Sequence, residues 1–410
     1  MVYKTEKGKR ILNVNKKKIL FLLFSPLYTK GGHSKNFINI VKYLAQEIQM
    51  NDFNARIISF NNTNQDVVIN RQKVKQVDFL NTYKIVYFIR RFSSGKVVFQ
   101  LVEFVLNVFR TFYQLVKYKP DIVYCYADKP LLLSFIWKRI LRFKLVFDMR
   151  GDTINELKVQ KTSRLKLSIL AKLYNIAYSN VDMLFSVSDT FKPDKILKVV
   201  PKFNYYDGDV FAYNQDQAKQ KKKELDLNNK FVFVYTGNSR YYQMIDETIR
   251  FFGQFYIKHN NSFLVIISEF GQVNFVNHLK DNNVPNNAWL IKSLKQTEIS
   301  SLQSIADMAL LIRDDLPLNH HSFPTKFAEY LACGVPVLMT PHIHSIAPMV
   351  QKHHLGEVIT LKEDYSVDIN RIYDNYMNNY EKKSYCSDFA KKKLMWQNKA
   401  HDIFDLIDKL

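Results

Sequence analysis

The residues best suited to chemistry lie close together in the second half of the chain. Residues 322–337 read Ser-Phe-Pro-Thr-Lys-Phe-Ala-Glu-Tyr-Leu-Ala-Cys-Gly-Val-Pro-Val, which predicts a proline-containing loop, a short helix ending at Gly334 and a strand. The first turn of a helix carries unpaired N–H groups and the positive end of the dipole, and both attract phosphate. Four residues fall at or just before this turn: Ser322, Pro324, Thr325 and Lys326. One turn further, the Glu329 carboxylate can accept hydrogen bonds from the sugar hydroxyls of a nucleotide.

Further polar residues follow predicted strands of the same half. Ligands of parallel α/β sheets bind at the carboxyl ends of the strands, so the residues after the strands 231–235 and 308–313 are candidates for the same site. These residues are Gly237, Arg240, Gln243 and Arg313. Arg240 and Lys326 together could neutralise two charges on a diphosphate, and charge-assisted contacts of this kind stabilise a leaving group as its bond breaks.

The first half offers two more candidate groups. Gly31 and Gly32 follow the first predicted strand, and a loop without Cβ atoms can approach a ligand closely, although a glycine pair is equally consistent with a plain turn. Asp148 and Arg150 follow the strand 144–147. Their position after the strand predicts that they face a cleft. The alternative is a structural ion pair between the two.

Strands and helices alternate along both halves, which indicates a parallel α/β domain in each half. We expect an α/β fold with two doubly wound domains, residues 1–200 and 201–393, a linker region at 195–215, and a final helix within 394–410 that returns to the first domain. The predicted strands are 18–24, 120–126, 144–147 and 181–187 in the first half, and 231–235, 263–267, 289–292, 308–313 and 337–339 in the second.

The segment 322–337 resembles the nucleotide-sugar motif of retaining glycosyltransferases of the GT-B class, specifically the family-4, glycogen-synthase-like type of bacterial polysaccharide and lipopolysaccharide biosynthesis. Members commonly read S-P-x-K-x-x-E-Y-L-A-x-G-x-P-V at this place. The resemblance implies two Rossmann-like domains facing across a cleft, with the nucleotide-sugar donor held mainly by the second domain. It departs at two positions, where His321 replaces a usual glutamate and Gln243 replaces a usual lysine.

The resemblance also implies a role for each candidate residue. Glu329 would bind the ribose, Arg240 and Lys326 the diphosphate, and Gly31 and Gly32 would approach the donor phosphates. Asp148 and Arg150 would orient the acceptor. The family type implies transfer with retention of anomeric configuration, without a cofactor or metal ion, because basic side chains take the role that a divalent cation has in other glycosyltransferases.

Charge is divided unequally between the halves. Residues 1–200 hold 35 Lys and Arg against 14 Asp and Glu, whereas residues 201–410 hold 24 against 24. In Lys84–Lys119 and Leu131–Phe147 the cations alternate with rings and aliphatic side chains, and helices of this kind can bind an anionic membrane surface. The alternative for each segment alone is an ordinary core helix with a solvated face. Without an RNP, zinc-finger or helix-turn-helix pattern, nucleic acid is not expected as a partner.

The remaining features point to a reducing compartment and a peripheral location. The three cysteines, Cys125, Cys333 and Cys386, have no paired spacing. No apolar run approaches the about 20 residues of a membrane-spanning helix. We therefore expect a cytoplasmic protein on the inner face of the membrane, with a lipid-linked glycan as acceptor. Two other functions are open: a catalytically silent relative that binds a membrane or a protein partner, and a GT-B sugar-nucleotide epimerase or hydrolase.

Overall fold

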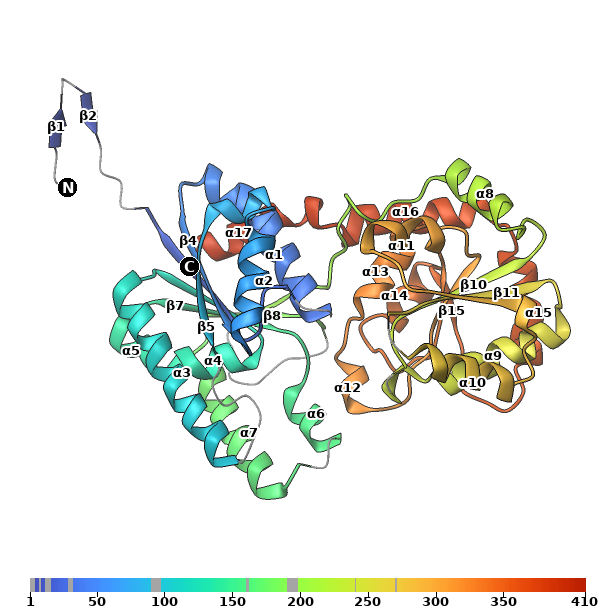
Figure 1. Ribbon diagram of the computed structural model, residues 1–410, viewed down its shortest axis with the longest axis horizontal. Helices are drawn as coiled ribbons and strands as arrows, with labels where there is room; N and C mark the ends of the chain where they lie inside the picture. The colour runs from blue at the N-terminus through green and yellow to red at the C-terminus, as the bar shows by residue number, and fades with distance from the viewer. Residues whose placement is uncertain are drawn as a thin grey trace.

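The computed structural model describes residues 4–6, 9–11, 16–28, 32–89, 97–159, 162–189, 198–239, 241–269 and 271–410. Within these ranges the chain forms two α/β domains, each built on its own sheet (Figure 1). A short antiparallel hairpin of β1 (Lys4–Glu6) and β2 (Lys9–Ile11) precedes the first domain.

A seven-stranded sheet forms the centre of the first domain, in the order β5-β4-β3-β6-β7-β8-β9, and all neighbours are parallel. Its central strands are continuous apolar runs that are buried on both faces, as parallel sheets require. The strands are β3 (Lys18–Leu23), β4 (Asn54–Asn61), β5 (Tyr83–Ile89), β6 (Ile122–Tyr126), β7 (Lys144–Met149), β8 (Met183–Ser186) and β9 (Val199–Pro201).

Helices cover both faces of this sheet. α1 (Gly32–Met50) and the C-terminal α17 (Ala400–Asp408) share one core with the sheet. On the other face, α4 (Asp128–Ser134) lies between α3 (Val97–Tyr118) and α7 (Arg164–Tyr178) and contacts both. The shorter elements are α2 (Asn64–Val74), η1 (Asp78–Thr82), η2 (Phe135–Trp137), α5 (Lys138–Leu141) and α6 (Thr153–Val159).

The second domain has a six-stranded parallel sheet in the order β12-β11-β10-β13-β14-β15. Its strands are β10 (Phe231–Thr236), β11 (Ser262–Ile267), β12 (Trp289–Lys292), β13 (Met308–Leu311), β14 (Val337–Met339) and β15 (Gly356–Val358). Its helices are α8 (Gln215–Glu224), η3 (Tyr241–Gln243), α9 (Ile245–Lys258), α10 (Gln272–Asp281), η4 (Asn286–Ala288), α11 (Gln296–Gln303), α12 (Pro317–His320), α13 (Thr325–Ala332), α14 (Ala347–Lys352), α15 (Ser366–Tyr376) and α16 (Tyr380–Leu394). The prediction of two doubly wound α/β domains is confirmed.

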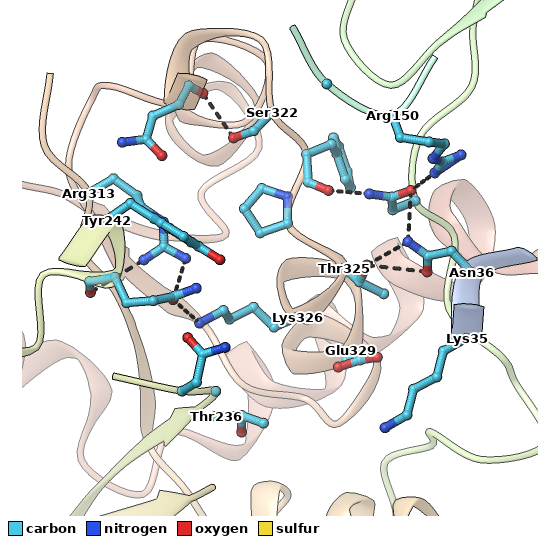
Figure 2. Close-up of a pocket in the computed structure, with 18 of the residues that line it drawn as sticks. Lys35, Asn36, Arg150, Thr236, Tyr242, Arg313, Ser322, Thr325, Lys326 and Glu329 are labelled. Atoms are coloured by element: carbon cyan, nitrogen blue, oxygen red, sulfur yellow. Dashed lines mark hydrogen bonds between the residues drawn. The ribbon is translucent and has the colours of Figure 1, made fainter. Parts of the chain in front are cut away.

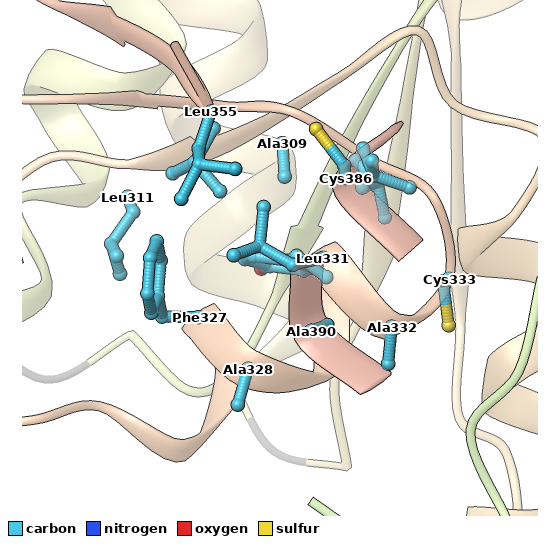
Figure 3. Close-up of a cluster of buried hydrophobic side chains, with 14 of the residues drawn as sticks. Ala309, Leu311, Phe327, Ala328, Leu331, Ala332, Cys333, Leu355, Cys386 and Ala390 are labelled. Atoms are coloured by element: carbon cyan, nitrogen blue, oxygen red, sulfur yellow. The ribbon is translucent and has the colours of Figure 1, made fainter. Parts of the chain in front are cut away.

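The core of the second domain holds α13 in place. Phe327 and Leu331 of this helix are fully buried among strand residues (Figure 3). Small residues on the facing helices, Ala332 on α13 and Ala390 on α16, let the two helices pack closely. Because one side of α13 is fixed in this way, the polar residues of its opposite side are directed into the space between the domains.

The chain crosses between the domains twice at one place. Tyr206, just after β9, donates its N–H to the carbonyl of Leu394 at 2.9 Å and accepts the N–H of Trp396 at 3.1 Å. Beyond this point η5 (Trp396–Asn398) and α17 pack on α1, and Trp396 stacks on Tyr43. The predicted return of the C-terminal helix to the first domain is confirmed.

One predicted helix is wrong in part. The aromatic, basic segment that begins at Lys84 was expected to be helical, but residues 83–89 form the edge strand β5, and only residues 97–118 form a helix. The run from Tyr83 to Ile89 is rich in aromatic and β-branched residues, which favour a strand. None of the described helices combines the length and apolarity needed to cross a bilayer. All three cysteines are free and buried.

Candidate active site

A cleft of about 650 Å³ lies between the two domains, at the carboxyl ends of both sheets. Its second-domain wall comes from the ends of β10 and β13 and from the first turn of α13 (Figure 2). Its first-domain wall comes from the first turn of α1 and from the loop after β7. Parallel sheets place their functional residues at this edge, so the topology alone brings segments far apart in sequence to one cavity.

The N-terminus of α13 opens into this cleft. Pro324 precedes the helix and has no polar side chain to cap the first N–H groups. The loop before it is fixed, because the Ser322 hydroxyl donates to the Asn319 carbonyl at 2.9 Å and the Ser345 hydroxyl donates to the Ser322 carbonyl at 2.8 Å. All of the predicted residues Ser322, Pro324, Thr325, Lys326 and Glu329 line the cleft.

Two cations of the second domain converge on one amide oxygen. The Gln243 Oε1 atom accepts from Arg313 Nη2 at 2.7 Å and from Lys326 Nζ at 2.7 Å (Figure 2). The Tyr235 hydroxyl lies 3.2 Å from the same oxygen. Lys326 also lies over the Tyr235 ring, 4.6 Å from its centre. Gly237 makes this approach possible, since a Cβ at its position would lie 3.0 Å from Lys326 Nζ and its φ of +143° disfavours other residues.

No carboxylate forms an ion pair with either cation in the part of the chain that the structure describes. Arg313 is buried, and among the described residues its guanidinium donates only to neutral oxygens of Gln243 and Ile312. Burial lowers the pKa of Lys326 well below its usual value, the positive charge of Arg313 lowers it further, and Glu329 opposes both from a greater distance. Burial likewise lowers the pKa of Arg313. A buried arginine beside a half-buried lysine, with no described carboxylate in ion-pair contact with either, is costly, and a bound anion would lower that cost.

Glu329 lies deeper on the same wall. It lines the cleft on the same helix as Lys326, with Lys35 of α1 approaching it from the first domain (Figure 2). Burial raises the pKa of Glu329 to about 7, and the nearby Lys35 and Lys326 only partly oppose this rise. In the described chain no group donates a hydrogen bond to its carboxylate, so its acceptor capacity is available to a ligand.

The first-domain wall is arranged differently. Asp148 is fully buried and does not reach the cleft; it pairs with Arg150 at 2.9 Å and with Lys202 at 2.8 Å, and the Tyr124 hydroxyl also donates to it. The positive charges of Arg150 and Lys202 hold the pKa of Asp148 below its usual value despite its burial. Arg150 does line the cleft, and it donates to Asn204. The ion pair that the sequence left as an alternative is therefore present, and Asp148 positions Arg150.

Polar contacts between the domains close one end of the site. Asn36 of α1 donates to the Thr325 hydroxyl at 3.3 Å and to the Asn204 Oδ1 atom at 3.4 Å. Asn204 in turn donates to the Phe323 carbonyl at 2.5 Å. The first turns of α1 and α13 are thus held against each other, with both positive helix ends at the cleft.

Sequence reasoning did not identify several residues that line the cleft, among them Lys35, Asn36 and Asn204. The first two lie near the start of α1, which begins at the second glycine of the Gly31-Gly32 pair, a signal that could have identified them. Asn204 lies in the linker and carries no motif. Of the other predicted residues, Gly31 and Arg240 lie outside the described residues, Gly32 begins α1, and Gln243 and Arg313 line the cleft. His321 is half-buried, and burial lowers its pKa.

Solved structures share this architecture at low sequence identity. HepE of Anabaena, crystallised with UDP and glucose, is 16% identical with a TM-score of 0.67, and the match covers 96% of this chain and 100% of that one. Sucrose-phosphate synthase of Thermosynechococcus elongatus is 10% identical with a TM-score of 0.71, over 96% and 99%. WaaG, a glycosyltransferase involved in lipopolysaccharide biosynthesis, is 12% identical with a TM-score of 0.62, over 95% and 99%. None of the curated proteins matches the chain in sequence.

The chain has a fold of the GT-B type, with two Rossmann-like domains and a cleft between them. Residues 216–393, which make up most of the second domain, match the family "Glycosyl transferases group 1". The match includes Gln243, Arg313, Lys326 and Glu329, which line the cleft. The predicted similarity to GT-B glycosyltransferases is confirmed by this match and by the shared fold.

Proposed function

We propose that the protein transfers one sugar from a nucleotide diphosphate sugar to a lipid-linked glycan, with retention of anomeric configuration. The observation that carries this proposal is the pair Arg313 and Lys326, two cations that converge on Gln243 Oε1 without a carboxylate, beside the N-terminus of α13. A diphosphate fits such a site because it provides the missing negative charge and accepts from helix N–H groups.

The proposed chemistry needs positioning and charge neutralisation. The bond between the anomeric carbon and the diphosphate oxygen breaks, the acceptor oxygen bonds to the same face of that carbon, and the acceptor proton passes to the departing phosphate oxygen. Arg313 and Lys326 stabilise the negative charge that develops on the leaving group. Glu329 would accept from the ribose hydroxyls. Since the two side chains supply positive charge where the bond breaks, we propose that neither a metal ion nor another cofactor is required.

The acceptor is proposed to bind against the first domain. Arg150, fixed by Asp148 and Asn204, is directed into the cleft and can donate to acceptor hydroxyls or to an acceptor phosphate. The excess positive charge of residues 1–200 favours a place of action at an anionic membrane, where a lipid-linked acceptor is found. We propose accordingly that the enzyme works on the cytoplasmic face of the membrane as a peripheral protein.

An NMR assay tests the proposal. The protein is incubated with candidate nucleotide sugars and a lipid-linked glycan fraction, and the anomeric proton of the product is followed alongside release of the nucleotide diphosphate. We expect an α-linked donor to yield an α-linked product on the lipid fraction. Release of free sugar alone would indicate a hydrolase, isomerisation of the donor an epimerase, and an unchanged donor a catalytically silent relative; each of these outcomes contradicts the proposal.

A further inference from the structure

Helix α3 buries its polar side and exposes its apolar side, which is the reverse of an ordinary surface helix. The side that faces the protein is polar: Glu103, Asn107, Thr111 and Gln114 are buried at a spacing of three to four residues. A helix that packs on a sheet normally buries its apolar stripe and exposes its polar one. Here the apolar side is left outside, which needs an explanation that folding alone does not supply.

Specific contacts fix this orientation. Arg110 Nη1 donates to the Asn107 Oδ1 atom at 2.8 Å, to the Glu103 carboxylate at 3.0 Å and to the carbonyl of Ile89 on β5 at 3.2 Å. Further along, Arg56 of β4 donates to Gln114 at 3.3 Å. Rotating the helix to bury its apolar side would break the bonds that join it to the sheet, those of Arg110 with Ile89 and of Gln114 with Arg56. The outward direction of the apolar stripe is therefore built into the fold.

The exposed side is large and continuous. On α3 it comprises Val98, Phe99, Leu101, Val102, Phe104, Val105, Leu106, Phe109, Tyr113 and Val116. A second apolar stripe runs along α7, at Leu165, Ile169, Leu173 and Ile176, and Ile136 and Ile140 of the η2–α5 segment are exposed as well. Figure 1 shows α3, α5 and α7 gathered at one end of the first domain, away from the second domain, and both long helices contact α4.

The exposed charges at this end are almost all positive. They include Lys117, Lys119, Arg139, Arg142, Lys144, Arg164, Lys166 and Lys172. A second copy of the chain docked on this surface would bring two strongly basic faces together, which electrostatics opposes. An anionic bilayer instead accepts the apolar side chains below its headgroups and the cations among them.

We infer that α3, α5 and α7 form a single membrane-inserting surface, in which the outer stripe of α3 lies lengthwise in the headgroup region of an anionic bilayer. The inference deepens the proposed function, on which it rests for the location of the acceptor. α7 contacts α6, which follows Arg150 and leads to the cleft, and α6 contacts α12 of the second domain. A protein bound in this way would hold the mouth of the cleft close to the lipid headgroups.

Vesicle co-sedimentation tests the surface. The full chain is mixed with vesicles of phosphatidylcholine alone and of phosphatidylcholine with phosphatidylglycerol, as wild type and as the double variant Leu101→Ser with Phe109→Ser. Both side chains are exposed, by 62% and 58%, so the fold should persist. The matched control is Ile257→Ser with Val273→Ser, which removes two exposed apolar residues of the second domain, 79% and 72% exposed.

We expect wild type to bind the phosphatidylglycerol vesicles, and the α3 variant to bind them at least about tenfold more weakly, because each buried aliphatic or aromatic side chain contributes strongly to lipid partitioning. The control should bind like wild type. Equal binding by the α3 variant, or binding to neither vesicle type, would overturn the inference. So would a wild-type dimer in light scattering that the α3 substitutions dissociate. Nucleotide-induced thermal stabilisation, measured on the same variants, reports on the donor site independently of membrane binding. A protein that binds nucleotide but not vesicles would contradict only the membrane surface, whereas one that binds vesicles but no nucleotide would contradict only the proposed function.

Discussion

The cleft contains one arginine from each domain, and the two differ in what balances their charge. Arg150 of the first domain has a carboxylate at 2.9 Å, and that carboxylate is shared with Lys202. Arg313 of the second domain donates only to neutral oxygens, with Lys326 beside it on the same amide. The first site has one carboxylate in direct contact with two cations, whereas at the second site neither Arg313 nor Lys326 forms an ion pair with any described carboxylate, and Asp314 and Glu329 act on their charges without such contact.

This difference separates a positioned side chain from a binding site. A cation balanced by its own protein is held in place and gains little from a further anion. A cation pair left unbalanced is destabilising until an anion arrives, and part of the binding free energy of a diphosphate is then the relief of that cost. Exchanging carboxylate and amide between the two sites should therefore exchange their properties.

The largest effect is expected in the first domain, for Asp148→Asn. Removing one partner of a buried ion pair typically costs about 3–5 kcal/mol, and here two cations lose their carboxylate. Chemical unfolding followed by tryptophan fluorescence should show this loss. Asp209→Asn, which removes a largely exposed partner of Lys42, should cost less than about 1 kcal/mol. Similar losses for both variants would show that Asp148 has no special role.

The same pair predicts a pH dependence. The pKa of Asp148 is lowered in the folded protein, so its stabilising contribution is complete above the unfolded-state value of about 4 and disappears as the pH falls further toward the folded-state value. Wild type should lose stability over this acidic range, and Asp148→Asn should lose less. Parallel unfolding curves for the two proteins would contradict the assignment.

The next effect is expected in the second domain, for Lys326→Ala. Removing a cation from the leaving group should lower kcat/KM for transfer by about 100-fold to 1,000-fold, by analogy with the loss of one donor to a developing anion. The melting temperature without ligand should not fall, because the substitution removes an unbalanced charge. A large loss of stability together with activity would mean that Lys326 serves the fold.

A smaller effect is expected for Gln243, the residue that contacts both cations of the second domain. Gln243→Glu gives Arg313 and Lys326 the carboxylate that Arg150 already has. We expect a higher melting temperature without ligand and a nucleotide affinity lowered by roughly tenfold or more, since the protein would then supply the counter-charge itself. Gln243→Ala is the control, which removes the amide without adding charge and should not raise the melting temperature. Tighter nucleotide binding by Gln243→Glu would contradict the account.

The smallest effect is a pH dependence of donor binding. Burial raises the pKa of Glu329 to about 7, and only the ionised carboxylate accepts from both ribose hydroxyls. Affinity for a nucleotide sugar, whose diphosphate does not titrate near neutrality, should rise as the pH increases toward and through 7. Calorimetry at several pH values should show this rise in wild type but not in Glu329→Gln. A flat profile in wild type would remove the ribose assignment.

Residues inside one contiguous motif could be predicted well from the sequence. Lys326 and Glu329 are placed by a single helix, and that helix begins where proline and threonine indicate. Arg313 follows its strand and faces the same edge. Contacts between distant segments could not be predicted, such as Asn36 with Thr325, because they depend on how two domains pack and no local pattern reports that.

The orientation of α3 on the sheet could not be predicted from the sequence either. The alternation of polar and apolar residues identifies a helix with two faces, but periodicity does not say which face meets the sheet. The ordinary expectation buries the apolar face, whereas the structure buries Glu103 and Asn107, with Arg110 donating to the Glu103 carboxylate, to Asn107 Oδ1 and to the Ile89 carbonyl of β5. The assignment of Gly31 and Arg240 to the donor phosphates stays a prediction, since both lie outside the described residues.

The unbalanced cation pair is tested most directly by thermal shift. Wild type, Lys326→Ala and Gln243→Glu are each melted with UDP, GDP, CMP and ADP. We expect at least one nucleoside diphosphate to raise the melting temperature of wild type, and neither variant to respond to the same degree. If no nucleotide stabilises wild type, or if Lys326→Ala responds equally, then Arg313 and Lys326 are not a diphosphate site, and a catalytically silent relative becomes the better description.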